Sequence, residues 1–166
     1  VNVSGATQNA EKLVAVFGGG YDTTQDNPGY TTGSVGNRIY MVDLLSGALL
    51  WRAGPSTDAG AQLRLAKMTN AIPADIRVID LTGDGYADRM YATDTGARVW
   101  RFDIYNGQPA STLVTGGVFA SLGIADGNPG DALHDARRFY YAPDVALGRA
   151  NRRAFLNIAV GTGWGG

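Results

Sequence analysis

The stretch Arg98-Val-Trp-Arg-Phe-Asp103 decides the fold class of this chain, because it repeats Arg38-Ile-Tyr-Met-Val-Asp43 from sixty residues earlier. Both stretches alternate large side chains, end at an aspartate and lead into a turn that closes on a glycine, Gly107 in one copy and Gly47 in the other. Such alternation between turn residues is typical of a short β-strand. A repeat built from such strands indicates the blades of a β-propeller, whose usual period of about 40–50 residues is lengthened here by insertions.

Further short runs of β-branched and aromatic residues predict where the other strands lie. We expect one all-β domain over residues 1–166, part of a modified β-propeller with about two and a half antiparallel blades: a first blade at about 11–53, a second at about 74–120, and the start of a third at about 137–166. The strands expected are 12–17, 38–43, 48–52, 76–79, 89–93, 98–103, 113–120, 138–145 and 154–160. A short helix is expected at 63–68.

An acidic loop, Asp80-Leu-Thr-Gly-Asp-Gly-Tyr-Ala-Asp88, separates two strands of the second blade. It places oxygen-bearing side chains at positions 1, 3, 5 and 9 and glycine at position 6, which is the spacing of an EF-hand-type calcium loop. Ca²⁺ takes about 6–8 oxygen ligands, so alternate residues of a tight loop can surround it. The spacing predicts as metal ligands the side chains of Asp80, Thr82, Asp84 and Asp88 and the backbone carbonyl of Tyr86.

The loop differs from a helical EF-hand at its end and at its flanks. Position 12 is Tyr91, so the usual bidentate glutamate is missing, and we expect Asp88 to replace it. The flanks show no helical periodicity, which predicts a strand–loop–strand site. A metal-free turn is the alternative, since Asp and Gly are common in turns for their own reasons. Three aspartates within nine residues repel one another without a cation, which favours calcium.

Composition excludes several classes of function. The net charge is −1 and the sequence pI is about 5.7, so neither nucleic acid nor an anionic membrane is predicted as a partner. Cysteine is absent, which excludes disulfides, thiolate metal sites and cysteine nucleophiles. The sequence has no apolar run long enough to span a membrane and no signal-peptide pattern at its start.

The run from Ile79 to Ile104 resembles the signature blade of the PilY/PilC type IV pilus tip-associated proteins. It joins the acidic loop to Asp88-Arg-Met-Tyr-Ala-Thr-Asp94 and then to Gly96-Ala-Arg-Val-Trp-Arg-Phe-Asp103, in the order of that family. The stretch Val16-Phe-Gly-Gly-Gly-Tyr21 is similar to the Gly-x-Gly-Tyr strands of the same proteins. Thr82 departs from the Asp or Asn that is more usual at the third loop position.

The resemblance implies a propeller domain at the C-terminal end of a large exported bacterial protein, located at the cell surface and the pilus tip. It implies that the remainder of the propeller and the signal peptide lie outside this chain. The role implied is non-enzymatic: support of pilus assembly, surface adhesion and twitching motility, with Ca²⁺ in the loop tuning pilus extension against retraction. The partners implied are minor pilins or other pilus components and a host or abiotic surface.

Two other functions fit parts of the sequence. A quinoprotein-like dehydrogenase is suggested by the run from Asp43 to Trp51, which has the Asp-x-x-x-Gly-x-x-x-x-Trp pattern of such blades, although those enzymes build their calcium site from separate blades. A generic integrin-type cell-surface propeller would carry similar acidic loops, repeated blade after blade. Catalysis by an acid–base triad is not expected, because His134 is the only histidine and no Gly-x-Ser-x-Gly motif occurs.

Overall fold

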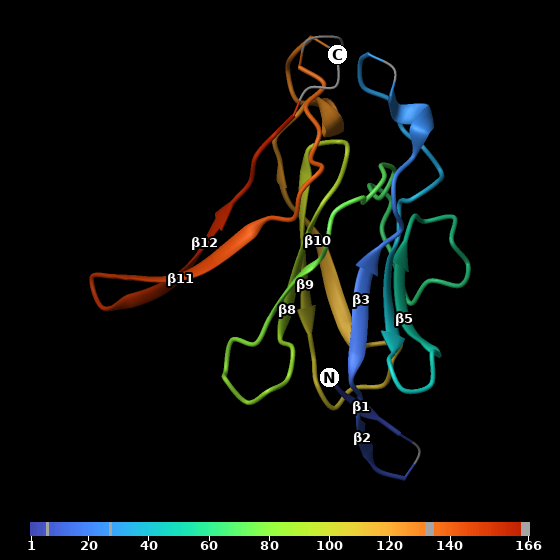
Figure 1. Ribbon diagram of the computed structural model, residues 1–166, viewed down its shortest axis with the longest axis vertical. Helices are drawn as coiled ribbons and strands as arrows, with labels where there is room; N and C mark the ends of the chain where they lie inside the picture. Colours follow the sequence, from blue (N-terminus) through green and yellow to red (C-terminus); the bar gives the residue numbers. More distant parts are fainter. Residues whose placement is uncertain (6, 27, 132–134, 164–166) are drawn as a thin grey trace.

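The computed structural model describes residues 1–166 apart from 6, 27, 132–134 and 164–166. The described part is all-β, as expected, and contains no α-helix. Two short 3₁₀ segments, η1 (Thr23–Asp26) and η2 (Ala125–Gly127), interrupt its loops. Two four-stranded sheets face each other, and a two-stranded hairpin projects from one side of the molecule (Figure 1). None of the helical segments in the described ranges is long and apolar enough to cross a membrane.

The first sheet has the strand order β3-β4-β5-β6. Its members are β3 (Val14–Gly18), β4 (Ile39–Asp43), β5 (Leu49–Gly54) and β6 (Leu63–Arg64). The first three are antiparallel, whereas β6 runs parallel to β5. The helix expected at 63–68 is wrong: Leu63 and Leu65, two residues apart, both pack against the core, and the Leu65 amide donates to the Gly54 carbonyl. A period of two suits a strand and not a helix.

The second sheet is an antiparallel meander with the order β10-β9-β8-β7. It comprises β7 (Arg77–Ile79), β8 (Arg89–Thr93), β9 (Arg98–Ile104) and β10 (Val114–Ser121), which lie within one residue of the strands expected from the sequence. The register of β10 against β9 shifts between Val118 and Ala120, so Phe119 forms a β-bulge. The acidic loop connects β7 to β8.

Two hairpins complete the described chain: β1 (Asn2–Ser4) with β2 (Asn9–Glu11), and β11 (Asp144–Ala150) with β12 (Arg153–Ala159). The strand expected at 138–145 is wrong over most of its length, because β11 begins only at Asp144. Pro143 has no N–H to give to a ladder, and the apolar side chain of Phe139 lies fully buried in the core instead of on a strand face.

The core lies between the two four-stranded sheets. Strand alternation turns Trp100 and Phe102 of β9 toward Trp51 of the first sheet, and the rings of Trp51 and Phe102 meet edge to face at 6.1 Å. The opposite face of the second sheet presents Tyr91 and Val99, which cluster with side chains of the β11–β12 hairpin. The second sheet is therefore packed on both faces: one face meets the first sheet, and the other meets the β11–β12 hairpin.

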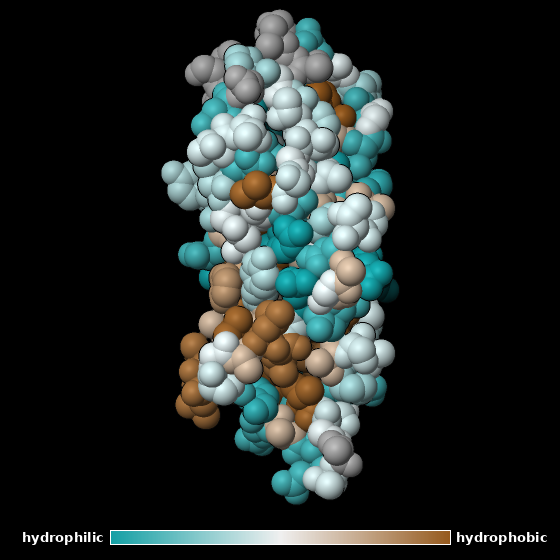
Figure 2. All heavy atoms as spheres, turned by 90° about the vertical axis from the view of Figure 1, so that its right-hand side faces the viewer, coloured by the Kyte–Doolittle hydropathy of each residue, from teal (hydrophilic) through white to brown (hydrophobic). Residues whose placement is uncertain are grey.

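Exposed apolar side chains gather at one end of the first sheet, just before β3, in the turn after β4 and at the start of β5. We name Leu13, Leu44, Leu45 and Leu49 the leucine patch; Leu13 is 66% and Leu45 88% exposed. Leu13 and Leu44 lie side by side, because the Leu44 amide donates to the Leu13 carbonyl at 2.9 Å. Figure 2 shows the side of the molecule that lies at the right of Figure 1, and apolar residues gather in its lower half. Contiguous apolar surface of this kind marks places where proteins meet partners.

Candidate metal centre

The acidic loop is an exposed connection whose two ends are fixed by β7 and β8. The Asp88 amide donates to the Ile79 carbonyl at 2.9 Å, which closes the base of the loop. Gly83 and Gly85 adopt φ angles of 78° and 87°, in the left-handed region that favours glycine. A Cβ at either position would meet no atom within 4 Å. The glycines are therefore required for the backbone angle and not for space.

Asp80, the first position of the loop, accepts three backbone hydrogen bonds. Its Oδ1 accepts from the amides of Thr82 at 3.1 Å and Gly83 at 2.6 Å, and its Oδ2 accepts from the Gly85 amide at 2.8 Å. These bonds, that from Gly85 first, lower the pKa of Asp80. The carboxylate is thus ionised at neutral pH and held in place, as a calcium ligand must be.

Asp88 and Thr82 bring further oxygens to the same place. Oδ2 of Asp88 accepts from the amides of Leu81 at 2.7 Å and Thr82 at 3.1 Å. The Thr82 hydroxyl lies 3.4 Å from Asp80 Oδ1 and 3.3 Å from Asp88 Oδ2. Oxygens that share a Ca²⁺ at about 2.3–2.6 Å are themselves about 3 Å apart. The Thr82 hydroxyl therefore lies close to this spacing from one oxygen of each of the two aspartates.

The side chains of Asp84 and Tyr86 make contacts away from the Thr82 hydroxyl. Oδ1 of Asp84 accepts from the Tyr86 amide at 2.9 Å, within its own turn. Across the residues that the structure describes, no three acidic or histidine side chains converge as a metal cluster. The Tyr86 hydroxyl donates to the Glu11 carboxylate on β2, and this bond raises the pKa of Tyr86. Asp84 must therefore rotate away from its turn to complete the predicted ligand set.

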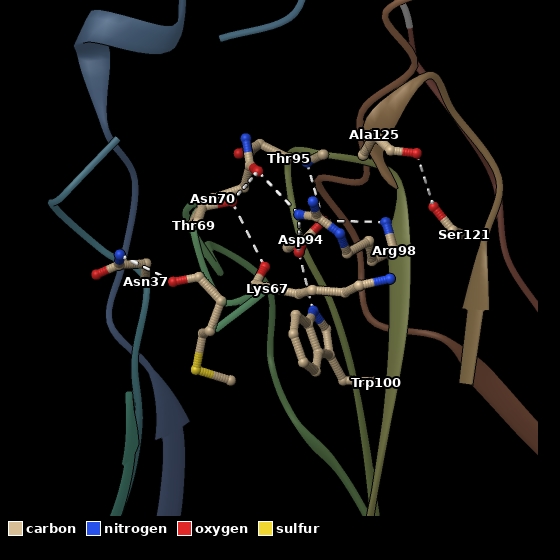
Figure 3. A network of polar contacts seen from close by, with 12 residues as sticks. Asn37, Lys67, Thr69, Asn70, Asp94, Thr95, Arg98, Trp100, Ser121 and Ala125 are labelled. Atoms are coloured by element: carbon tan, nitrogen blue, oxygen red, sulfur yellow. Dashed lines mark hydrogen bonds and ion pairs between the residues drawn. The ribbon is translucent and has the colours of Figure 1, made fainter. Parts of the chain in front are cut away.

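A second carboxylate site, which the sequence did not predict, is buried at the turn between β8 and β9 (Figure 3). Oδ1 of Asp94 accepts from the amides of Gly96 and Arg98, each at 2.9 Å. Its Oδ2 accepts from Trp100 Nε1 at 2.9 Å and lies 3.4 Å from the Arg98 guanidinium. Burial raises the pKa of Asp94 against these bonds. The one feature of the sequence that could have indicated this site is the Thr-Gly turn that follows Asp94.

Arg98 extends this network to other loops. Its Nε lies 3.0 Å from Asp126 Oδ2, and its Nη1 donates to Asn70 Oδ1 at 2.9 Å. The Arg98 side chain is only 3% exposed. Both oxygens of Asp94 accept from donors, and the network joins the β8–β9 turn to the loops that carry Asn70 and Asp126. His134, the histidine considered for catalysis, lies outside the described residues.

No family model matches this chain, and no curated protein matches it in sequence. Among solved structures it is similar to the crystal structure of the Pseudomonas aeruginosa PilY1 C-terminal domain, with a TM-score of 0.56 and 19% identity. The match covers 99% of this chain and 32% of that one, so the chain spans about a third of its length. The likeness confirms the expected fold class: the chain is all-β, with a propeller-like fold similar to part of the PilY1 C-terminal domain.

Proposed function

We propose that this chain is a calcium-binding, non-enzymatic segment of a type IV pilus-associated protein. The observation that carries the proposal is the position of the Thr82 hydroxyl, 3.4 Å from an Asp80 oxygen and 3.3 Å from an Asp88 oxygen, in an exposed strand–loop–strand connection. The fold shared with the PilY1 C-terminal domain supports the connection to pili. The resemblance in sequence points to the same class of protein.

The residues that would hold Ca²⁺ are Asp80, Thr82, Asp84, Asp88 and the carbonyl of Tyr86. A bound Ca²⁺ would supply positive charge that offsets three carboxylates. Asp80 and Asp88 already stand at the two ends of the loop, so a shared ligand ties the end of β7 to the start of β8. Tyr86 carries this ordering to β2 through its bond to Glu11. The role in pilus assembly, adhesion and twitching motility would then rest on surfaces that calcium orders.

Calorimetric titration of the chelator-treated chain with Ca²⁺ tests the metal site. We expect one site with a Kd between about 10⁻⁷ and 10⁻³ M. Calcium at a hundred times Kd should add about 2.7 kcal/mol to the free energy of unfolding and raise Tm. Asp88→Asn should weaken binding strongly, whereas Asp144→Asn, an exposed carboxylate on β11, should not. A folded chain that shows neither heat nor a shift in Tm would refute the site.

The pilus assignment needs a separate experiment in the source bacterium. Pili sheared from the cells should contain the protein, and its deletion should reduce piliation, attachment to surfaces or twitching. Absence from the pilus fraction together with unchanged motility and attachment would overturn the pilus role. The calcium result would be unaffected, so the two parts of the proposal can fail independently.

A further inference from the structure

We propose that the tip of the β11–β12 hairpin, residues 149–153, binds an anionic polysaccharide through Arg149, Arg152 and Arg153. We name these five residues the basic tip. The inference goes beyond the proposed function, because it uses none of the predicted calcium ligands and identifies the chemistry of a partner.

The basic tip concentrates positive charge. Residues 145–160 contain the three arginines and no acidic residue, although the net charge of the whole chain is −1. The rest of the chain is therefore negative overall. Figure 1 shows the tip standing clear of both four-stranded sheets, and all three arginines are exposed.

The three arginines of the tip also differ from most other arginines in having no internal partner. Within the part of the chain that the structure describes, no hydrogen bond or ion pair holds their side chains. Six other arginines each form an ion pair with an aspartate: Arg38, Arg52, Arg77, Arg89, Arg98 and Arg101. The guanidinium groups of the tip are therefore available to an anion from outside the chain.

The turn at the tip carries a residue that its backbone disfavours. Arg149 pairs with Ala154 and Ala150 with Arg153, so Asn151 and Arg152 form a two-residue turn. Their φ angles are 49° and 63°, and positive values at both positions are those of a type I′ turn. Asparagine tolerates such angles, but glycine is usual at the second position because a Cβ is unfavourable there.

Arg152 is therefore present against the preference of the turn. Backbone strain of this kind gathers at sites that bind ligands or partners. An exposed arginine that lowers the stability of its own hairpin and has no partner in the described chain is explained by binding and not by folding.

The tip remains exposed whatever lies beside the hairpin. A strand that pairs with a free edge of β11 or β12 runs alongside it, because the hydrogen bonds of a ladder lie within the sheet. The turn closes the end of the sheet and is not covered by such a strand. The basic tip therefore does not depend on an unfilled strand position.

The directions of the arginines define the shape of the ligand. Arg149 lies on the face of the hairpin that carries Leu147 and Leu156, whereas Arg153 lies on the opposite face and Arg152 at the turn. A small anion would need donors that converge on it. Diverging arginines suit a flexible polymer whose carboxylates, phosphates or sulfates repeat along its length, since a guanidinium can bind each of these groups by two hydrogen bonds.

The surroundings of the tip favour a polysaccharide over other polyanions. An anionic membrane suits it less, because the turn residues Asn151 and Arg152 offer no apolar side chain to enter the bilayer. A nucleic acid duplex is dense in charge and would also meet the negative remainder of the chain. A polysaccharide with sparser charge can contact the tip alone. This choice of polymer rests on the proposed function, which locates the chain at the cell surface, whereas the basic tip does not.

Fluorescence polarisation of a labelled oligogalacturonate, titrated with the chain in calcium-free buffer, tests the proposal. We expect binding that a neutral oligoglucan of the same length does not show. Raising NaCl from about 50 mM to about 500 mM should weaken it by about tenfold or more, since salt screens exposed charges. No binding at about 1 mM, or equal binding of the neutral polymer, would overturn the proposal.

Variants of the tip separate binding from folding. Arg152→Gly should raise Tm, because glycine suits the turn, and should weaken the oligosaccharide by about threefold. The triple variant Arg149→Gln, Arg152→Gly and Arg153→Gln should weaken it by about tenfold or more. Arg64→Gln removes the same charge from an exposed position on β6 and should leave affinity unchanged. Unchanged affinity in the triple variant, or a lower Tm for Arg152→Gly, would count against the proposal.

Two competing ligands complete the test. Tighter binding to a DNA duplex, or to vesicles of anionic phospholipid, in a way that the triple variant abolishes, would assign the tip to a different partner and refute the polysaccharide. A chain that is found on pili and binds calcium but not the oligosaccharide refutes the basic tip alone. A chain that binds the oligosaccharide but is absent from pili refutes the pilus role and leaves the tip as a binding site.

Discussion

Asp94→Asn should destabilise the chain, and the structure gives the size of the effect. The substitution keeps the shape of the side chain and replaces one carboxylate oxygen by an NH₂ group. If the amide oxygen stays at Oδ1, it continues to accept from Gly96 and the backbone of Arg98. The NH₂ then faces Trp100 Nε1 and the Arg98 guanidinium, which are both donors.

Two losses make up the expected change. The orphaned Nε1 of Trp100, whose side chain is almost fully buried, costs about 1–3 kcal/mol. Arg98 loses a buried carboxylate at a long 3.4 Å, which adds about 1.5 kcal/mol, the low end for a hydrogen bond to a charged group. Asp126 still neutralises this guanidinium, so the full cost of an unpaired buried charge is not reached. The expected loss is about 3 kcal/mol.

Urea unfolding followed by tryptophan fluorescence measures this loss. For a domain of this size the m-value is about 2 kcal/mol/M, so the midpoint should fall by about 1.5 M at unchanged m. Asp144→Asn is the matched control, because Asp144 is 79% exposed and pairs with Arg77 at 3.3 Å. It should change stability by less than about 0.5 kcal/mol. Equal midpoints for the two variants would show that the network around Asp94 contributes nothing.

Three further predictions concern other parts of the fold. Lys12 lowers the pKa of Asp43 to about 2, so the stability from this pairing is present above pH ~4 and is lost as pH falls through about 2; Asp43→Asn should flatten the stability-versus-pH curve in that window. Gly85→Ala should lower the free energy of unfolding by about 1 kcal/mol, because Gly85 has a positive φ. Gly117→Ala is the control, since Gly117 also has open space around its Cβ position but no positive φ, and urea unfolding should show no loss of stability. Phe102→Ala should cost about 3–5 kcal/mol in the same assay, because its ring is fully buried between the two sheets; a smaller change than for an exposed phenylalanine would contradict the assigned core.

The strands of the second sheet could be predicted from sequence because their alternation is strong and their ends are marked by turns. The sequence repeat predicted β4 and β9, and the β-branched and aromatic residues that flank the acidic loop predicted β7 and β8. Prediction failed where a long-range contact decides the local structure. Leu63 becomes a strand residue because it pairs with Ala53 of β5, and Phe139 lies outside any strand because its side chain is buried beside Tyr91 and Val99. Neither contact has a local signal.

The candidate site shows the same division. Spacing alone identified the oxygens of the acidic loop, since a loop of nine residues cannot separate them far. Spacing could not show that Asp84 bonds to the amide of Tyr86, two residues on, because that bond is a local alternative to metal binding. The network of Arg98 was beyond prediction for a different reason. Asn70 and Asp126 are each 28 residues from it in the chain, and the fold alone brings them together.

Asp80 and Asp94 show why a carboxylate in a glycine-rich turn has two possible roles. Both accept backbone amides from the residues that follow them, so their local geometry is similar. Asp80 is exposed, and hydrogen bonding lowers its pKa; Asp94 is buried, and desolvation outweighs its bonds and raises the pKa. The charge of Asp94 is already taken up by Trp100 and Arg98, whereas that of Asp80 faces solvent beside Asp88. A cation can therefore reach Asp80 but not Asp94, so the burial of the turn separates the proposed metal ligand from a carboxylate with a structural role.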